Sequence, residues 1–368
     1  MNILYVTTIS NTVNAFLVPH IEMLVNQGHS VDVACKIVQE VDPSLRDLGC
    51  KVHELPFSRE VMKNDFKGLI GGLRQTVIDH GYDVVHTHTP IASVVARMAC
   101  RNLEGVKVIY TAHGFHFYKG APLLNWAVYY PVEMILSRYT DVLVTINRED
   151  FERSGKFYAG ETRLINGVGI DLEVDEVDAG ELDGLRRELG IAEGELVLIS
   201  VGELNQNKNH EIVIKAVKEL GDSSVRYLIV GEGELKGYLE DLVAEYGLED
   251  QVSLLGYRDD VDRLLQVSDV FVFPSFREGL SRALMESMKH GKPCVVSDIR
   301  GNRDLIVDGE GGVLVANDVG EYVEAVRQMS SEDVRVQFGE FNRDRIKDFS
   351  LDKVLGQLRE AYGVVGGE

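Results

Sequence analysis

One stretch of the sequence decides the fold: Phe271-Val-Phe-Pro-Ser-Phe-Arg-Glu-Gly-Leu-Ser-Arg-Ala-Leu-Met-Glu-Ser-Met-Lys-His-Gly-Lys-Pro-Cys-Val-Val-Ser297. The β-branched and aromatic residues of 268–273, stopped by Pro274, predict a buried parallel strand that runs into a loop. Strong helix formers from Ser281 onward predict a helix, and Gly291-Lys-Pro293 ends it before the next apolar run. The stretch therefore predicts a strand, a loop, a helix and a second strand, the repeating unit of a parallel sheet.

The helix start in such a unit suits an anion. Its free N–H groups and dipole lie at the carboxyl edge of the sheet and favour a diphosphate, which Gly279 allows close to the backbone. Glu278 precedes the first turn and Glu286 lies two turns further, roughly 10–12 Å away by helical rise. Carboxylates bind hydroxyls and repel phosphate, so the spacing fits a nucleotide sugar. On spacing alone, a solvated helix face is the simpler interpretation, because the chain has 59 acidic residues.

A longer motif adds to this pattern. The order Pro274-Ser275-x-x-Glu278-Gly279-Leu-x-x-x-Leu284-x-Glu286, followed by Gly291-x-Pro293-Cys-Val-Val, resembles the C-terminal signature of glycosyltransferase family 4. These are retaining enzymes with the GT-B fold, so the resemblance implies two Rossmann-like, doubly wound parallel-sheet α/β domains that face a cleft. It also implies that Glu278 binds hydroxyls of the donor sugar and Glu286 those of the ribose. The backbone after Glu278 contributes to donor binding at Gly279, Leu280 and Ser281.

Length and charge predict two domains with different surroundings. With 368 residues, 45% of them hydrophobic, the chain suits two domains of about 150–200 residues each. A net charge of −21 argues against nucleic acid as a partner. Residues 1–165 hold 16 basic and 17 acidic side chains, against 22 and 42 in the remainder. The nearly neutral first half is therefore the one suited to approach an anionic membrane.

No part of the sequence predicts insertion into a membrane. The N-terminal run Met1-Asn-Ile-Leu-Tyr-Val-Thr7 is too short and too little basic for a signal peptide. No window approaches the roughly 20 apolar residues that cross a bilayer. We therefore expect a cytoplasmic protein, soluble or peripheral at the inner face of the membrane. The four cysteines form no close pair, which predicts buried reduced thiols and no metal site.

The first half alternates strand and helix patterns, which predicts a doubly wound parallel sheet. The expected strands are 2–7, 29–35, 51–55, 83–86, 106–110 and 141–145, and the expected helices are 16–26, 41–48, 69–78 and 91–100. The glycine-rich first loop of a dinucleotide-binding domain is replaced by Thr7-Thr-Ile-Ser-Asn-Thr-Val-Asn14. Its small polar side chains, Asn11 and Asn14 among them, fit a sugar hydroxyl or an acceptor better than a phosphate.

Two histidine clusters follow neighbouring strands, Val85-His-Thr-His-Thr-Pro90 and Tyr110-Thr-Ala-His-Gly-Phe-His-Phe-Tyr-Lys119. We expect His86 and His88 to face opposite sides of a strand, and no nearby Asp or Cys completes a ligand set, which disfavours a metal site. The family resemblance gives His113 the role of the essential histidine beside the donor sugar. For His116, packing is at least as good an interpretation as catalysis.

Residues 115–130 contain six aromatic side chains, including the single tryptophan. This run predicts either a core helix with its loop or a surface for the membrane interface or a lipid acceptor. The mixed basic and apolar loop 58–67 belongs to the same surface or binds a diphosphate of the acceptor. The predicted acceptor-binding residues are Asn11, Asn14, Arg59, Lys63, His116 and Lys119.

A glycine-rich segment, Asn166-Gly-Val-Gly-Ile-Asp171, predicts the hinge between the domains. We place the N-terminal, acceptor-binding domain at 1–168 and the C-terminal, nucleotide-sugar-binding domain at 169–349. The resemblance implies that an amphipathic helix at about 350–363 packs back onto the first domain.

The second domain offers further donor-binding candidates. The run 196–202 predicts its first strand, after which the family has an arginine and, five residues later, a lysine, both on the donor diphosphate. Here Glu203 replaces the arginine and Lys208 is kept, which weakens the diphosphate site by one charge. The glycine-rich turn at Gly231 and the strand-end turn at Tyr257 and Arg258 match family positions near the base and ribose of the donor. The predicted donor-binding residues of this part are Gly202, Glu203, Lys208, Gly231, Tyr257 and Arg258.

The resemblance implies a metal-independent retaining glycosyltransferase without a cofactor. It would move a hexose or N-acetylhexosamine from a UDP-sugar to a polyprenyl-diphosphate-linked saccharide, for capsule, exopolysaccharide or O-antigen. The predicted catalytic residues are His113, Glu278 and Lys208: Lys208 stabilises the leaving diphosphate, and domain closure brings His113 to the sugar. No carboxylate is placed for a covalent intermediate, so we expect front-face attack by the acceptor hydroxyl. Two alternatives stay open, a UDP-N-acetylglucosamine 2-epimerase and a non-catalytic polysaccharide-assembly subunit.

Overall fold

The computed structural model describes residues 1–175 and 177–366, which divide into two compact units. Unit 1 contains Met1–Gly169 and the chain from Leu351 onward, and unit 2 contains Ile170–Ser350. The chain therefore leaves unit 1 once and returns to it.

Unit 1 is built on a seven-stranded parallel sheet in the order β3-β2-β1-β4-β5-β6-β7. The six strands predicted for the first half are confirmed as β1–β6, and the sequence analysis missed β7. The strands are β1 (Asn2–Ile9), β2 (Ser30–Lys36), β3 (Val52–Glu54), β4 (Val84–Thr87), β5 (Lys107–Ala112), β6 (Val142–Thr145) and β7 (Glu161–Leu164). The order reverses between β1 and β4, so a crevice is expected at their carboxyl ends.

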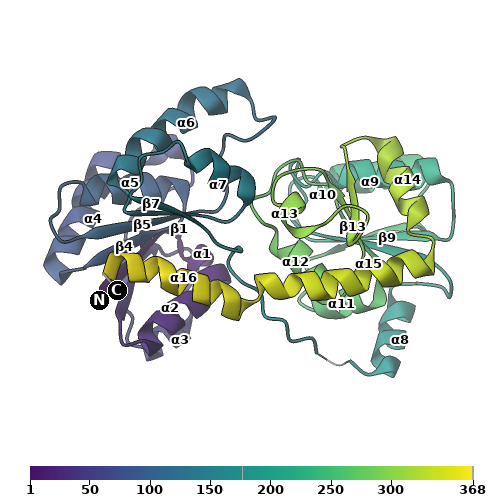
Figure 1. Ribbon diagram of the computed structural model, residues 1–368. Helices are drawn as coiled ribbons and strands as arrows, with labels where there is room; N and C mark the ends of the chain where they lie inside the picture. Colours follow the sequence, from purple (N-terminus) through teal and green to yellow (C-terminus); the bar gives the residue numbers. More distant parts are fainter. Residues whose placement is uncertain (176, 367–368) are drawn as a thin grey trace. The chain divides into compact units, whose positions relative to one another are not determined.

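Helices cover both faces of this sheet: α4, α5 and α6 lie on one face and α1, α2 and α16 on the other (Figure 1). Because side chains alternate along a strand, Leu4 and Val6 pack in the core under α4 and α5, whereas Tyr5 lies beside His86 on the opposite face. The helices are α1 (Ser10–Thr12), the π-helix η1 (Val13–Leu17), α2 (Val18–Asn26), α3 (Pro43–Asp47), η2 (Val61–Lys63), α4 (Phe66–His80), α5 (Pro90–Cys100), α6 (Leu123–Leu136), η3 (Ser137–Tyr139), α7 (Arg148–Ser154) and α16 (Leu351–Gly366).

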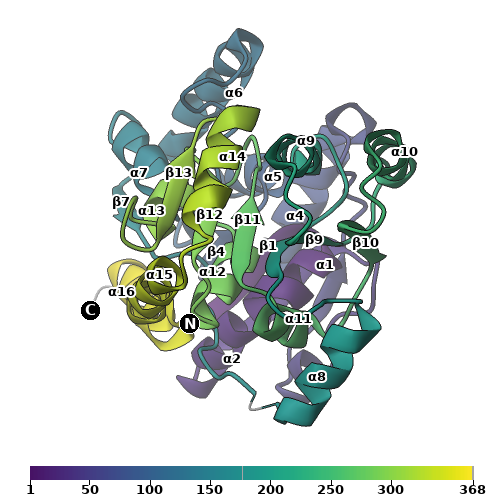
Figure 2. The ribbon, with the colours of Figure 1, turned by 90° about the vertical axis from the view of Figure 1, so that its right-hand side faces the viewer.

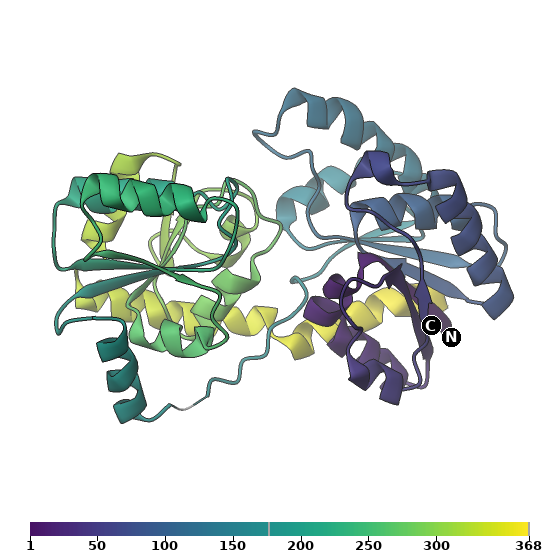
Figure 3. The same ribbon diagram turned by 180° about the vertical axis from the view of Figure 1, so that it is seen from behind.

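The last helix, α16, is held in unit 1 by polar contacts. The Tyr362 hydroxyl lies 2.7 Å from His86 Nδ1, and the Asn166 N–H donates to Gln357 Oε1. At its far end, α16 lies beside the start of the chain (Figure 3), where Gly366 approaches Met1.

Unit 2 has a six-stranded parallel sheet in the order β10-β9-β8-β11-β12-β13, and its order reverses between β8 and β11. Figure 2 shows β12 and β13 on one side of β11 and β9 and β10 on the other. The strands are β8 (Leu196–Val201), β9 (Val225–Val230), β10 (Val252–Gly256), β11 (Val270–Phe273), β12 (Cys294–Ser297) and β13 (Gly312–Val315).

The helices of unit 2 pack in two apolar layers. One layer joins the sheet to α9, α10 and α14, and the other joins it to α8, α11 and α12. The helices are α8 (Ala179–Glu188), α9 (His210–Leu220), α10 (Lys236–Tyr246), α11 (Val261–Val267), α12 (Arg282–Lys289), α13 (Asn302–Leu305), α14 (Val319–Gln328), α15 (Glu332–Arg345) and η4 (Ile346–Phe349). The stretch that opened the sequence analysis is β11, a loop, α12 and β12, as predicted.

Two further predictions concern the whole chain. All four cysteines, Cys35, Cys50, Cys100 and Cys294, are free and buried, which confirms the expected thiols. Over residues 1–175 and 177–366, we find no helix with the length and apolar character that crossing a membrane requires.

Candidate functional site

The two loops at the strand reversal of unit 2 are bonded to each other. The loop after β8 and the loop after β11 exchange backbone contacts, since the Phe276 N–H donates to the Asn207 carbonyl over 2.8 Å. The Asn207 side-chain amide donates back to the Arg277 carbonyl over 3.0 Å. The edge where a ligand is expected in such a sheet is therefore one connected structure.

Lys208 and Glu278 form an ion pair across this reversal. Lys208 Nζ lies 2.8 Å from Glu278 Oε1, and the two side chains are only 18% and 15% exposed. The ammonium also lies 4.5 Å from the centre of the Phe273 ring, at the end of β11. Two largely buried charges are tolerated because each neutralises the other. The structure thus brings together two of the three predicted catalytic residues.

Glycines let the backbone approach this pair. The Lys208 stem packs across Gly202, where an added Cβ would come within 3.0 Å of Lys208 Cε. Gly231 has a φ of +145°, and a Cβ there would overlap the Gly202 carbonyl oxygen. On the other side, a Cβ at Gly301 would overlap the Gly279 carbonyl oxygen. Side chains at these positions would separate the loops, which explains why short glycine turns are found there.

The start of α12 adds positive potential beside the ion pair. Ser281 is the N-cap residue and its hydroxyl accepts from the Leu284 N–H over 3.4 Å. The first turn of a helix has N–H groups without intrahelical partners, and its dipole favours an anion. Glu286 lies further along α12 and is paired with Arg282 over 2.9 Å. Lys208 and this helix start can together hold an anion such as a diphosphate.

The remaining predicted donor residues of unit 2 are less closely gathered. Glu203 is exposed and accepts from the Asn205 amide over 3.0 Å. The Arg258 guanidinium is bound by Asp260 at 2.6 Å, a hydrogen bond that raises the pKa of Arg258. Tyr257 beside it is 77% exposed. The Arg258 side chain is therefore already engaged within its own loop.

In unit 1, the half-buried His113 forms a stack with two buried imidazoles, those of His88 and His86. His88 Nδ1 lies 3.1 Å from His113 Nε2, and the ring centroids of His86 and His88 are 4.2 Å apart. The expectation that His86 and His88 face opposite ways is wrong, because side chains two residues apart in an extended chain point to the same side. Burial lowers the pKa of His86 and His88 well below 6.5 and that of His113 to about 4. All three are therefore neutral near pH 7.

The hydrogen bond within this stack favours one tautomer of His113. His88 Nε2 is buried and has no hydrogen-bond partner among the described residues. A buried N–H without a partner is costlier than a bare acceptor, so the His88 proton belongs on Nδ1. His88 then donates to His113 Nε2, and His113 carries its own proton on Nδ1. His113 is thereby suited to donate a hydrogen bond from Nδ1.

No three His, Cys, Asp or Glu side chains among residues 1–175 and 177–366 are grouped so as to hold a metal ion. This holds for the histidine stack as well.

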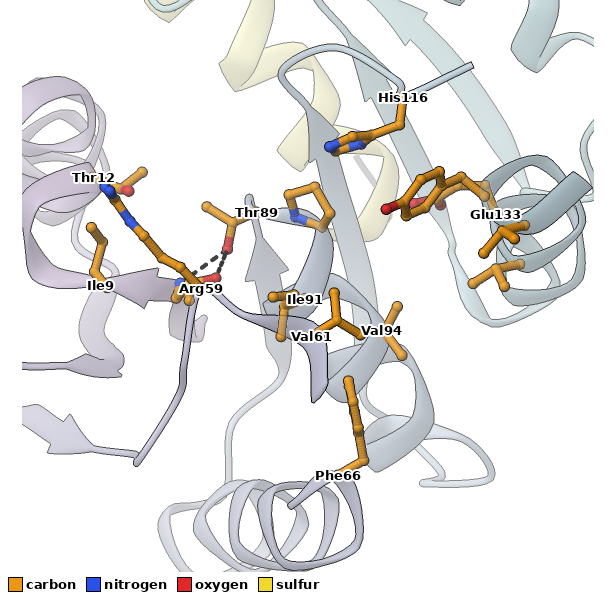
Figure 4. Close-up of a pocket in the computed structure, with 15 residues that line it drawn as sticks. Ile9, Thr12, Arg59, Val61, Phe66, Thr89, Ile91, Val94, His116 and Glu133 are labelled. Carbon is orange, nitrogen blue, oxygen red and sulfur yellow. Dashed lines mark hydrogen bonds between the residues drawn. The ribbon is translucent and has the colours of Figure 1, made fainter. Parts of the chain in front are cut away.

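A groove of about 580 Å³ opens beside the carboxyl ends of β1 and β4 (Figure 4). Two of the six predicted acceptor residues, Arg59 and His116, line it. The complete lining is Thr8, Ile9, Thr12, Arg59, Val61, Phe66, Thr89, Pro90, Ile91, Val94, His116, Val128, Tyr129, Val132 and Glu133. This groove is the candidate acceptor site.

The other four predicted acceptor residues do not line the groove. The Asn14 amide donates to the Glu40 carbonyl over 2.8 Å, and Asn11 reaches the same segment at Gln39. Lys63 pairs with Glu60 at 2.6 Å, and Lys119 lies outside the lining. Asn11 on α1 and Asn14 on η1 therefore use their side chains to hold the segment after β2.

Sequence reasoning missed several groove residues. The Thr8 and Thr89 hydroxyls lie 2.5 Å apart and join the ends of β1 and β4. Glu133 on α6 is paired at 2.8 Å with Arg97, which is 1% exposed. An arginine in the apolar run 91–100 was a signal for a buried acidic partner, because a buried charge needs one.

Comparison with known proteins fits this geometry. Residues 183–345 match the family model of glycosyl transferases group 1, and residues 2–147 match that of glycosyl transferase 4-like proteins. "Putative glycosyltransferase EpsD" of Bacillus subtilis (strain 168) is 33% identical over 369 residues, which cover 98% of this chain and 96% of that one. The chain belongs to glycosyltransferase family 4. The predicted family and enzyme class are therefore confirmed, and neither the epimerase nor the non-catalytic alternative gains support.

The name of another relative of this glycosyltransferase states a donor and an acceptor. The UDP-Gal:alpha-D-GlcNAc-diphosphoundecaprenol alpha-1,3-galactosyltransferase of Escherichia coli is 29% identical over 357 residues, covering 93% of this chain and 90% of that one.

Among solved structures, Anabaena Alr3699/HepE in complex with UDP superimposes on the glycosyltransferase with a TM-score of 0.82, at 20% identity and over 99% of this chain and 100% of that one. Sucrose-phosphate synthase from Thermosynechococcus elongatus gives a TM-score of 0.82 at 19% identity, over 100% and 99% of the two chains. These likenesses confirm the predicted GT-B fold.

Proposed function

We propose that this glycosyltransferase uses a UDP-sugar, transfers a hexose or N-acetylhexosamine with retention, and acts on a polyprenyl-diphosphate-linked saccharide. The reaction takes place at the inner face of the cytoplasmic membrane, in the synthesis of a cell-surface polysaccharide such as a capsule. The observation that carries the proposal is the Lys208–Glu278 ion pair beside the start of α12.

The ion pair suits a donor with a diphosphate next to a sugar. Before the donor binds, Lys208 and Glu278 neutralise each other at 2.8 Å. A diphosphate competes for the ammonium and is held as well by the N–H groups that begin α12. Glu278, relieved of its partner, accepts hydrogen bonds from hydroxyls of the sugar. The same ammonium and amides then stabilise the charge on the departing diphosphate.

Retention follows in this proposal from attack on the face that the diphosphate leaves. His113 is neutral near pH 7 because burial lowers its pKa to about 4, so it acts as a hydrogen-bond donor from Nδ1 toward the transferred sugar and not as a cation. The leaving diphosphate itself is the nearest base for the proton of the acceptor hydroxyl.

Two comparisons support the choice of donor and acceptor. HepE has been solved with UDP and with UDP-glucose, and the name of the Escherichia coli relative contains UDP-Gal and a diphosphoundecaprenol. The groove with Arg59 and His116 supplies a cation for an acceptor diphosphate. A nearly neutral first half, with 16 basic and 17 acidic residues in 1–165, allows approach to an anionic membrane.

The test is transfer of radiolabelled sugar from a panel of UDP-sugars to bacterial lipid extracts. We expect acceptor-dependent label in one lipid-linked product with an α-linkage. Lys208→Met should lower kcat/KM by about 10²–10³, as for loss of one group that stabilises a leaving anion. Lys236→Met is the matched control, because Lys236 forms an exposed pair with Glu240 on α10; it should change kcat/KM less than about twofold.

Three results contradict the proposal. A β-linked product excludes retention, and isomerised UDP-sugar without an acceptor indicates an epimerase. Equal activity of Lys208→Met and Lys236→Met removes Lys208 from the site.

A further inference from the structure

The groove of unit 1 has an apolar part that the chemistry of a saccharide does not require. Seven of its residues are valine, isoleucine or phenylalanine: Ile9, Val61, Phe66, Ile91, Val94, Val128 and Val132. A sugar is bound through hydrogen bonds to its hydroxyls, and an apolar wall leaves such hydroxyls without partners. A peptide would leave backbone N–H and C=O groups unpaired there for the same reason. The ligand that matches this wall is a hydrocarbon.

Arg59, the cation of the groove, and Phe66 lie at different ends of it. In Figure 4, Arg59 extends toward Thr12, and His116 approaches from the loop after β5, whereas Phe66 lies at the far end. We find no acidic partner of Arg59 within residues 1–175 and 177–366. The groove is therefore amphipathic along its length, with a cation at one end and hydrocarbon at the other.

The one carboxylate in the wall does not oppose an anionic ligand. Glu133 is neutralised by Arg97 at 2.8 Å and accepts from the Tyr110 hydroxyl at 3.3 Å. Arg97 is itself fixed by Ser93, whose carbonyl and hydroxyl accept from its guanidinium. Because Arg97 neutralises Glu133, this position of α6 brings no net charge to the wall of the groove.

Exposed apolar side chains continue the wall outward along α6. Leu123 and Leu124 at its start are 86% and 71% exposed, and Met62, next to Val61 of the lining, is 95% exposed. Val128 and Val132 belong to the same helix and line the groove itself. Exposed apolar surface next to an apolar groove is typical of a site that receives a lipid from a membrane.

We propose that the groove binds the isoprenoid chain of a polyprenyl diphosphate, with its diphosphate at Arg59 and His116. The inference rests on the proposed function, because it names the lipid part of that acceptor. A volume of about 580 Å³ lies in the ~300–1,000 Å³ range that encloses a drug-sized ligand, so the groove holds the first isoprene units. The rest of the chain passes along α6 into the bilayer.

The experiment measures binding of farnesyl diphosphate and of inorganic diphosphate to the full-length protein by calorimetry. We expect farnesyl diphosphate to bind at least about tenfold more tightly, from burial of its hydrocarbon. Val132→Trp fills the groove and should remove this advantage without changing the affinity for inorganic diphosphate. Ile135→Trp is the matched control, because Ile135 is an exposed residue of α6 that does not line the groove; it should bind like the wild type. Arg59→Ala should weaken both ligands.

Equal affinity for the two ligands overturns the inference, as does an equal loss in Val132→Trp and Ile135→Trp. If Val132→Trp does not fold, Val128→Trp probes the same wall. The binding assay needs neither donor nor transfer. Tight, groove-dependent binding without any sugar transfer to lipid therefore contradicts the proposed function alone, and transfer with no farnesyl advantage contradicts this inference alone.

Discussion

Acidification should unfold unit 1 through its buried histidines. Burial lowers the pKa of His20, His86, His88 and His113, the last to about 4. The unfolded chain binds these protons near pH 6.5, so between about pH 6.5 and 4 it carries more protons than the folded state. Stability is therefore complete above pH 6.5 and is lost as the pH falls.

The magnitude follows from the number of protons. Each extra proton that the unfolded chain binds lowers the free energy of unfolding by about 1.36 kcal/mol for each pH unit of acidification. For His113, with a pKa of about 4 in place of 6.5, the full loss is about 3 kcal/mol. His86, His88 and His113 together give a slope of about 4 kcal/mol per pH unit near pH 5.5, and the lowered pKa of His20 adds to it. Since a domain has only about 5–15 kcal/mol to lose, unit 1 should unfold within about one to four pH units of acidification.

The single tryptophan provides the assay. Trp126 lies on α6 in unit 1, packed near Phe117 and Tyr130, so its fluorescence reports unfolding of this unit. Urea titrations between about pH 7 and 5 measure how the free energy of unfolding changes with pH. This pH range lies above that in which ordinary carboxyl groups titrate. His113→Asn, at the least buried of the four histidines, should lower the slope by about 1.2 kcal/mol per pH unit, the contribution of one proton near pH 5.5. A wild-type slope below about 1.4 kcal/mol per pH unit would refute the reasoning, because it means uptake of fewer than one proton.

Two further predictions concern packing. Gly231→Ala should destabilise unit 2 by about 3 kcal/mol or more and abolish transfer, because its Cβ overlaps the Gly202 carbonyl oxygen at a φ that alanine avoids; urea unfolding and kcat/KM measure both effects. Glu133→Gln should cost unit 1 about 3–5 kcal/mol, because it leaves Arg97 charged and buried without its partner; Trp126 fluorescence in urea measures it.

Both substitutions have matched controls. Gly237→Ala places a Cβ on α10 where no atom lies within 4 Å, and it should stabilise unit 2 slightly through helix propensity. Glu60→Gln breaks the exposed pair with Lys63 and should cost less than about 1 kcal/mol. If a substitution and its control lower the free energy of unfolding by similar amounts, the corresponding packing argument is contradicted.

The sequence predicted local structure well where the pattern of apolar residues repeats. The run 271–297 gave β11, α12 and β12 because strand, stop and helix signals agree within a few residues. The short strand β7 (Glu161–Leu164) was missed, because its side chains are neither strongly apolar nor strictly alternating. The loop that carries Glu278 was found through its motif, but nothing local indicated that Lys208, seventy residues earlier, would pair with it.

The sequence by itself determined the parallel sheets, the family and the short motifs that carry Lys208, His113 and Glu278, because each depends on neighbours a few positions away. Only the tertiary structure decided which side chains meet. His88 and His113 meet because β4 and β5 are neighbours in the sheet, and a lysine and a glutamate pair because the sheet reverses its order between β8 and β11. Such contacts depend on strand order and on where each strand stops, which long-range packing sets and local pattern does not.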